Sequence, residues 1–442
     1  MVPNIVLIII DSLREDKFYG KNKTSFTPNI DRLIEKGTYF SQAISSADVT
    51  GICLGNIFTG MFSQKTGIIQ RTFNPKIKTI FDILKENNFH VNATIPDLIW
   101  FKQLTEKFDQ VDRYYSANRI QEGLSNNVGI QILNHLESIK MKEPWIYYIH
   151  LEDLHEKIQV PSEFDKDEYG KTNYEKMISY IDTWIGKIID QCDLEKTLII
   201  ITSDHGDYIP IVNHVGQIPK VQSIMKKGKK IAPSLEPIGL KLFILIRNIT
   251  KFFHKKKLKN QLTPEEFRTL NSRGQTTLDE ETLKVPLLII GNKIPKKKIN
   301  DLVGGIDIFP TMLNQIGIKS DNSNIDGRDL TELINGGKLK EIPMFIQTGD
   351  IQEQKESLII GIRTSEFKYY RDRKNSEHNV CLYNIQKDPF ETNNIAVSFP
   401  EIIKSMEEFL KKYESCSLIS DIKNNDDKTK EIEDELKKMG YV

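Results

Sequence analysis

An aspartate and a histidine stand side by side directly after an apolar run. The run covers residues 198–202, and the pair is Asp204 and His205. Near the N-terminus a second apolar run, residues 4–10, leads straight into Asp11. Hard divalent cations take oxygen ligands, and softer ones also accept imidazole. Asp11, Asp204 and His205 are therefore predicted to be ligands of one metal ion.

Strands and helices must bring these residues together, and the hydrophobic pattern of the sequence predicts where such strands and helices lie. Short apolar strands alternate with helical patterns, which is typical of an α/β fold with a mostly parallel sheet covered by helices on both faces. In such sheets ligands bind at the carboxyl ends of the strands. Strands are expected at residues 4–10, 39–43, 90–94, 145–151, 198–202 and 285–290, and helices at 27–37, 80–87, 128–140, 174–192 and 308–316.

Thr50 is a candidate nucleophile. It follows the small-residue segment 45–49 at the expected start of a helix. The helix dipole and a nearby cation both favour an anionic oxygen at that place, so a hydroxyl there can attack an ester. The alternative is that Thr50 serves only as a helix N-cap.

Further polar residues follow the expected strand ends. His155 lies beyond the strand at 145–151, where it could protonate a leaving oxygen or bind an oxyanion. His214 and Lys220 follow the Asp-His pair closely enough to reach the same site. A second metal ion would need more ligands, and the sequence offers Asp153, His155 and His214 for that role.

The composition of the chain argues against several classes of protein. The 442 residues are 39% hydrophobic and 28% charged, as in an ordinary globular protein, and the formal net charge is zero. We therefore expect no nucleic-acid partner. The four cysteines form no CxxC pair, which argues against a disulfide framework and a thiolate zinc site. No leader-like segment precedes the first strand, so we expect a cytoplasmic location.

The pattern of apolar and charged residues divides the chain into three parts. Residues 1–335 are predicted to form the α/β domain, 336–415 a small antiparallel α+β subdomain, and 416–442 a charged helical tail. The domain carries a basic insertion at about 217–276. Within it, residues 238–259 have the spacing of a basic amphipathic helix, which either packs on the protein or makes peripheral contact with an anionic membrane.

Several motifs in order resemble the sulfatase family of the alkaline phosphatase superfamily. They are residues 3–14, 27–37, 58–60, 150–155, 202–207, 283–290, 307–311, 326–328 and 382–394. The resemblance implies an alkaline phosphatase-like fold with a small C-terminal antiparallel subdomain.

The resemblance also implies roles for the candidate residues. Asp11, Asp204 and His205 would bind Ca²⁺, Mg²⁺ or Mn²⁺, with Zn²⁺ an option for a two-metal site. His155 would match the histidine that binds substrate or acts as the acid. Lys220 would contact the sulfate or phosphate group.

The chain departs from the family at the nucleophile. Sulfatases carry Cys or Ser there, within Cys-x-Pro-Ser-Arg, and convert it to formylglycine. Counting back from residues 58–60 places Thr50 at that position, with Ile52, Cys53 and Leu54 replacing Pro, Ser and Arg. A formylglycine hydrate has two hydroxyls and can expel sulfate by forming a carbonyl. Threonine has one hydroxyl, and a phospho-threonine is the more workable intermediate.

We therefore expect a metal-dependent hydrolase of sulfuric or phosphoric esters, with phosphoesters or phosphodiesters preferred. The expected substrate is a small-molecule or glycan ester. Two alternatives stay open: a transferase that moves a phospho-substituent onto a glycan or lipid-linked acceptor, and a sulfatase-fold binding protein without catalysis. The sequence indicates no oligomeric state.

Overall fold

The computed structural model describes residues 2–69, 73–117, 120–121, 123–155, 158–209, 268, 277–319, 324–349 and 359–415. The chain forms two compact units, one of Met1–Asp207 with Arg273–Val442 and one of Tyr208–Ser272. Apart from Arg268, the predicted insertion at 217–276 lies outside the described residues, as do its helix at 238–259 and the tail at 416–442. Among the described residues, no helix is long and apolar enough to cross a bilayer.

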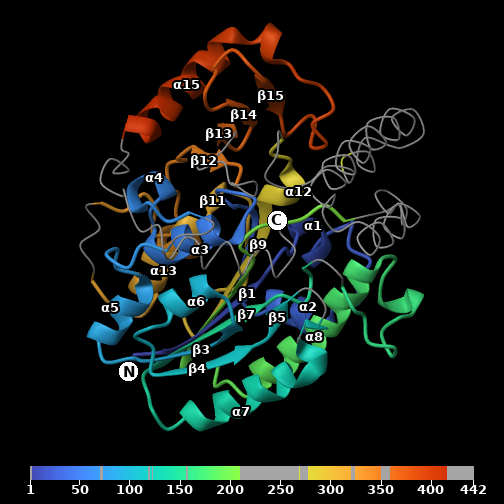
Figure 1. Ribbon diagram of the computed structural model, residues 1–442, viewed down its shortest axis with the longest axis vertical. Helices are drawn as coiled ribbons and strands as arrows, with labels where there is room; N and C mark the ends of the chain where they lie inside the picture. The colour runs from blue at the N-terminus through green and yellow to red at the C-terminus, as the bar shows by residue number, and fades with distance from the viewer. Residues whose placement is uncertain are drawn as a thin grey trace, which may run out of the picture. The chain divides into compact units, whose positions relative to one another are not determined.

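A nine-stranded mixed sheet forms the centre of the first unit (Figure 1). Strand β9 runs antiparallel to both of its neighbours, and every other pairing is parallel. The predicted mostly parallel α/β fold is thus confirmed. The strands in spatial order are β10 (Lys297–Ile299), β2 (Thr38–Ile44), β9 (Lys284–Ile290), β8 (Thr197–Thr202), β1 (Asn4–Ile10), β7 (Trp145–Leu151), β3 (His90–Pro96) and β4 (Gln110–Tyr114), and β11 (Val303–Gly304) also pairs with β2.

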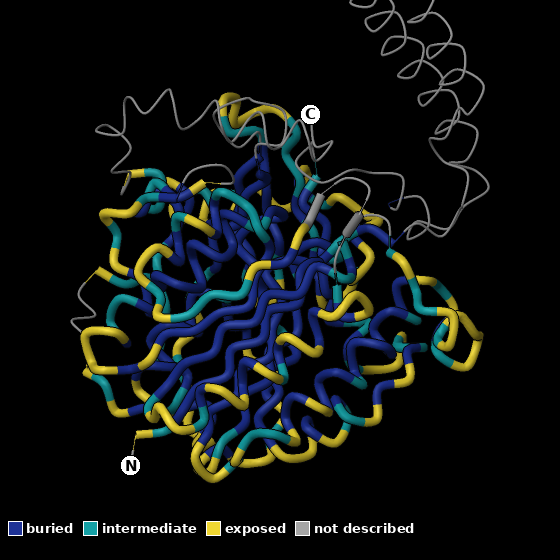
Figure 2. The backbone as a smooth tube through the Cα atoms, turned by 60° about the horizontal axis from the view of Figure 1, so that its bottom comes forward, coloured by how far each residue is buried: buried dark blue, intermediate teal, exposed yellow. Residues whose placement is uncertain are grey.

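The three central strands β8, β1 and β7 are buried along their whole length, because helices cover both faces of the sheet (Figure 2). Apolar side chains on both faces explain why each strand is a continuous hydrophobic run in the sequence. One face packs with α3 (Thr50–Thr59), α5 (Ile80–Glu86), α6 (Ile99–Leu104), α13 (Ile308–Gln315) and α14 (Thr331–Ile334). The other side carries α2 (Pro28–Ile34), α7 (Gly129–Ile139) and α8 (Asn173–Asp190).

A four-stranded antiparallel sheet follows near the C-terminus. Its strands pair in chain order, and α15 (Pro400–Ser415) buries Met406 and Leu410 in the same hydrophobic cluster as the sheet. The strands are β12 (Met344–Gln347), β13 (Ile359–Arg363), β14 (Phe367–Asp372) and β15 (Cys381–Asn384). The remaining short helices that bear on the site are α1 (Glu15–Phe18), α4 (Ser63–Thr66) and α12 (Glu280–Leu283).

A buried ionic network connects α12 to this small sheet. Arg363 is fully buried and donates two hydrogen bonds of 3.0 Å to the Glu280 carboxylate. The ammonium of Lys368 lies 3.4 Å from Glu280 and also contacts Glu391. Burial opposes ionisation of Glu280, but Arg363 and Lys368 lower its pKa to about 2. Burial, aided by the charges of Asp279 and Glu280, raises the pKa of Glu391 to about 8 despite Lys368.

Removing one partner of this network should destabilise the fold strongly. We expect Arg363→Leu to lower the free energy of unfolding by about 3–5 kcal/mol, because the Glu280 carboxylate would stay buried without its bidentate partner. Urea unfolding near neutral pH measures the loss. The control is Arg32→Ala, whose pair with Asp190 is exposed and should be worth less than about 1 kcal/mol. Equal losses in the two variants would contradict a structural role for the buried network.

The same network predicts a pH dependence. The folded pKa of Glu280, about 2, lies below its ordinary value of 4.5. Its stabilising contribution is therefore fully present above pH 4.5 and is lost as the pH falls toward 2. We expect the stability difference between the wild type and Glu280→Gln to shrink over that interval, as measured by urea unfolding at a series of pH values. A difference that stays constant would show that Glu280 is not ionised in the folded protein.

Candidate functional site

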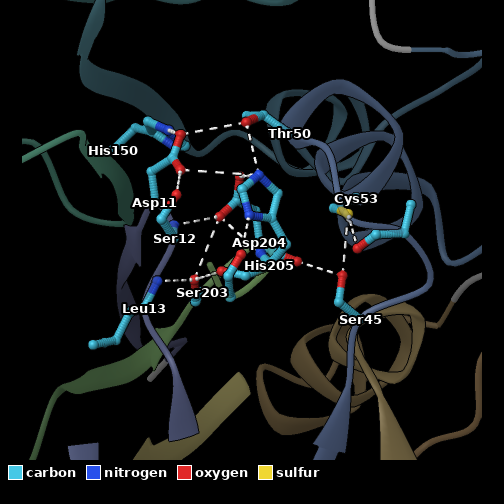
Figure 3. A network of polar contacts seen from close by, with 12 residues as sticks. Asp11, Ser12, Leu13, Ser45, Thr50, Cys53, His150, Ser203, Asp204 and His205 are labelled. Carbon is cyan, nitrogen blue, oxygen red and sulfur yellow. Dashed lines mark hydrogen bonds and ion pairs between the residues drawn. The ribbon is translucent and has the colours of Figure 1, made fainter. Parts of the chain in front are cut away.

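Three neighbouring strands bring polar side chains to one edge of the large sheet (Figure 3). Ile9 on β1 lies opposite His150 on β7 and Thr202 on β8. Side chains alternate between the two faces of a strand, so residues two apart share a face. Asp11 and Asp204, two residues beyond Ile9 and Thr202, therefore extend on the face of His150. This is the face that packs against α3.

The loops that follow β1 and β8 are hydrogen bonded to each other. Ser12 has a left-handed backbone, with φ of 65°, which turns the chain sharply after Asp11. Its backbone N–H donates to Asp204 Oδ1 at 3.2 Å, and its hydroxyl donates to Asp11 Oδ1 at 2.6 Å. The backbone N–H of Leu13 donates to Ser203 Oγ at 2.9 Å. These bonds hold the two aspartates at a fixed separation.

His205 and the two aspartates form a buried group that could hold a metal ion. Nδ1 of His205 lies 2.9 Å from the Gly206 carbonyl oxygen, which can only accept, so Nδ1 carries the hydrogen and Nε2 has the lone pair that a metal ion would bind. Nε2 lies 3.5 Å from Asp204 Oδ2 and 3.9 Å from Asp11 Oδ1. Asp204 Oδ2 accepts no hydrogen bond from the residues that the structure describes. An unprotonated nitrogen facing such a carboxylate fits a divalent cation.

Thr50 is the first residue of α3 and faces this group. Its Oγ1 lies 3.3 Å from Asp11 Oδ2 and 3.3 Å from His205 Nε2. Val49, not Thr50, occupies the N-cap position of the helix, and it makes no side-chain cap. The interpretation of Thr50 as an ordinary N-cap is therefore wrong, and its hydroxyl is directed to the predicted metal ligands.

The segment before Thr50 is held by the small C-terminal sheet. Ala47 and Gln347 form an isolated parallel β-bridge. In addition, the backbone N–H of Gln347 donates a hydrogen bond of 2.9 Å to the Ser46 carbonyl oxygen. The backbone N–H of Gly349 donates to Asp48 Oδ1 at 2.6 Å. The position of the threonine hydroxyl thus depends on residues about three hundred positions later in the chain.

Cys53 lies one helical turn after Thr50 and points elsewhere. Its sulfur lies 3.2 Å from the Ala47 carbonyl oxygen and 3.1 Å from Ser45 Oγ. Burial raises the pKa of the thiol, so it stays protonated at neutral pH. The thiol therefore does not replace a missing catalytic cysteine.

His150 and Glu152 also lie in the site, although no role was predicted for them from the sequence. Together with Asp11 they form a second buried group that could hold a metal ion. The signal for His150 was a polar residue inside an otherwise apolar strand. Burial opposes ionisation of Asp11, but a hydrogen bond with His150 and the charges that His205, His155 and His150 carry when they are protonated hold its pKa well below the usual range.

The other predicted residues have mixed outcomes. His155 lies close enough for its charge to lower the pKa of Asp11. Asp153, expected as a ligand of a second metal, instead accepts a hydrogen bond of 2.9 Å from the Leu124 backbone, and burial raises its pKa to about 6. Neither Asp153 nor His155 is part of the two potential metal-binding groups among the described residues. His214 and Lys220 lie outside the part of the chain that the structure describes.

Comparisons with known proteins give consistent matches. A model of the sulfatase family matches residues 3–318, and a model of the N-sulphoglucosamine sulphohydrolase C-terminal region matches residues 274–415. Human arylsulfatase K is 21% identical over an alignment of 466 positions, which covers 92% of this chain and 81% of the relative.

Proteins whose solved structures have the same fold act on different esters. The phosphonate monoester hydrolase of Agrobacterium radiobacter aligns with a TM-score of 0.67 at 14% identity, covering 94% of this chain and 96% of that chain. BT4656, solved with its substrate D-glucosamine-2-N,6-O-disulfate, aligns with a TM-score of 0.64 at 16% identity, covering 95% of this chain and 99% of that chain. At these identities the likeness concerns the fold.

A side chain at Gly206 should disturb the loop that carries Asp204 and His205. The Gly206 backbone N–H donates to the Thr282 carbonyl oxygen at 2.9 Å, and an added Cβ would overlap the Glu281 carbonyl oxygen. We expect Gly206→Ala to weaken the binding of a divalent cation by about 10–100-fold, as measured by calorimetric titration with Mn²⁺.

The matched control for this prediction is Gly291→Ala at the end of β9. An added Cβ there meets its nearest atoms at 3.5 Å, which is ordinary van der Waals contact. Its cation affinity should equal that of the wild type. Unchanged affinity in Gly206→Ala would show that the loop does not position the ligands.

Proposed function

This chain belongs to the sulfatase family of the alkaline phosphatase superfamily, and we propose that it is a metal-dependent hydrolase that cleaves phosphoric esters in preference to sulfuric esters. The observation that carries the proposal is the position of Thr50. A single hydroxyl, at the start of α3, lies 3.3 Å from both Asp11 and His205, where the nucleophile of an ester hydrolase would stand.

Asp11, Asp204 and His205 would hold the metal ion, which we expect to be Ca²⁺, Mg²⁺ or Mn²⁺. The fit rests on the unprotonated Nε2 of His205 and on Asp204 Oδ2, which lacks a hydrogen-bond donor among the described residues. When bound, the cation lowers the pKa of a neighbouring hydroxyl and neutralises charge on the ester oxygens.

Thr50 would act as the nucleophile. The nearest acceptor for its hydroxyl proton is Asp11 Oδ2, because His205 Nε2, at the same distance of 3.3 Å, would be occupied by the metal ion. The N-terminus of α3 favours negative charge on the threonine oxygen. The bond between Oγ1 and phosphorus forms as the ester bond breaks, and His155 gives a proton to the departing alcohol oxygen. Water then attacks phosphorus, which releases phosphate and restores the threonine.

The preference for phosphorus follows from the chemistry of one hydroxyl. A threonine sulfate has no second hydroxyl through which the sulfate could be expelled, so it would have to break by attack at sulfur. A threonine phosphate can be hydrolysed at phosphorus. The fold itself does not determine whether the enzyme acts at phosphorus or at sulfur, because a phosphonate monoester hydrolase and a protein with a sulfated-sugar substrate share it.

Removing the Thr50 hydroxyl should abolish turnover. We expect Thr50→Ala to lose roughly 10⁴-fold or more in kcat/KM while it keeps its cation affinity, because the side chain is the nucleophile and not a required ligand. The matched control is Cys53→Ala, in the same helix, which should retain turnover since its thiol faces away from the site. Full activity in Thr50→Ala would refute this assignment.

A substrate panel tests the preference for phosphorus. Aryl phosphate, aryl phosphodiester, aryl phosphonate and aryl sulfate should be compared with each of Ca²⁺, Mg²⁺, Mn²⁺ and Zn²⁺. We expect a phosphoric ester to give the highest kcat/KM. A higher value for aryl sulfate would contradict the proposal, and transfer to an added alcohol in place of water would indicate a transferase. No turnover with any ester and cation would favour the binding-protein alternative.

A further inference from the structure

A buried tyrosine on α8 contacts the turn that follows Asp11. Tyr174 is the second residue of this helix and is 4% exposed. Its hydroxyl donates a hydrogen bond of 2.6 Å to the Ser12 carbonyl oxygen and accepts one of 2.9 Å from the Arg14 backbone N–H. The tyrosine therefore connects two backbone positions of the turn to a helix that lies outside the site.

Both of these hydrogen bonds have a single possible direction. The Ser12 carbonyl oxygen can only accept and the Arg14 N–H can only donate, so the hydroxyl hydrogen must point to Ser12. Burial raises the pKa of the Tyr174 phenol, although the hydrogen bond from Arg14 lowers it in part. The charges of Asp16 and Asp207 raise it further. The phenol therefore stays protonated at neutral pH and remains a donor.

The turn needs such a contact because its backbone is strained at Ser12. A left-handed φ of 65° is unfavourable for a residue with a side chain, and it persists only where surrounding contacts enforce it. Ser12 is fully buried, so its carbonyl oxygen depends on partners within the protein. Without the Tyr174 hydroxyl, the turn could relax toward a more common backbone conformation.

The orientation of Ser12 matters for both predicted carboxylate ligands. Its backbone N–H donates to Asp204 Oδ1 at 3.2 Å, and its hydroxyl donates to Asp11 Oδ1 at 2.6 Å. A rotation of the Ser12 backbone would therefore move both donors at once. A contact that fixes the Ser12 carbonyl oxygen consequently fixes the hydrogen bonds to both aspartates.

Helix α8 is itself held by contacts outside the site. Thr172 and Glu175 form a capping box at its N-terminus, in which the Glu175 backbone N–H donates to Thr172 Oγ1 at 3.2 Å. Further along the helix, the Asp182 carboxylate accepts a hydrogen bond of 2.7 Å from the Ile30 backbone N–H on α2. The tyrosine hydroxyl is thus presented to the turn from a firmly placed helix.

We propose that Tyr174 is a positioning residue for the cation site, which sets the separation of Asp11 and Asp204 by holding the turn at Ser12. The inference rests on the proposed function in one respect, namely that these aspartates bind a divalent cation. The hydroxyl bonds to backbone atoms of the turn, so Tyr174 acts through Ser12 and is not a catalytic residue.

Removal of one hydroxyl tests this role without relying on activity. The full chain is freed of metal with a chelator and titrated calorimetrically with Mn²⁺. We expect Tyr174→Phe to bind Mn²⁺ about 10-fold more weakly than the wild type, because the outer hydrogen bonds that orient metal ligands contribute to affinity. Urea unfolding of the metal-free proteins measures the stability of each variant separately. Tyr174→4-aminophenylalanine, which keeps an N–H donor at the end of the ring, should recover most of the lost affinity.

The matched control is Tyr147→Phe. The Tyr147 hydroxyl is buried and lies 2.6 Å from Thr94 Oγ1, so this variant also loses a buried hydrogen bond. Tyr147 stands three residues before His150 on β7 and therefore faces the opposite side of the sheet. It should bind Mn²⁺ as tightly as the wild type, whatever stability it loses. If Tyr174→Phe does not fold in buffer, all the titrations are repeated in trimethylamine N-oxide, which favours the folded state.

The outcomes separate this inference from the proposed function. Weaker Mn²⁺ binding in Tyr174→Phe alone, with recovery in the amino variant, would support the positioning role whether or not any ester is hydrolysed. Wild-type affinity in Tyr174→Phe, or an equal loss of affinity in Tyr147→Phe, would overturn the positioning role and leave the proposed function intact. No binding of Mn²⁺ by the wild type would overturn the proposed metal site and this inference with it.

Discussion

Parallel pairing of β8, β1 and β7 in one register is the constraint on which the site depends. The three strands are fully buried and lie side by side at the centre of the sheet. Their carboxyl ends meet at one edge, and the alternation of side chains puts Asp11, His150 and Asp204 on one face. A slip of one residue in either pairing would turn the slipped strand's side chains to the opposite face.

The small C-terminal sheet supports the site from two directions. Through Arg363 and Lys368 it holds Glu280 on α12, and α12 in turn accepts the hydrogen bond from Gly206 next to His205. Through the end of β12 it holds the segment that leads into Thr50. The two halves of the site, metal ligands and hydroxyl, are thus fixed relative to each other by a sheet that contributes no residue to either metal-binding group described here.

The proposed difference between this chain and its family lies at the N-terminus of α3. The fold is shared with proteins that act on sulfated sugars and on phosphonates, so architecture alone leaves the reaction open. The neighbouring thiol of Cys53 is buried and protonated, and the hydroxyl of Thr50 faces the carboxylate of Asp11. The proposed preference for phosphorus over sulfur therefore depends on which ester of a single hydroxyl can be hydrolysed.

The sequence by itself determined the central strands, the small antiparallel sheet and the meeting of Asp11, Asp204, His205 and Thr50. It could do so because apolar runs predict buried parallel strands, and residues directly after such strands must meet at one edge. Only the tertiary structure decided whether Glu152 or Asp153 lies beside Asp11. Adjacent residues at a strand end face opposite ways, and the pairing of β7 with β1 determines which one meets Asp11. For the same reason His150, a polar residue within an apolar run, became part of the site only when β7 was placed beside β1.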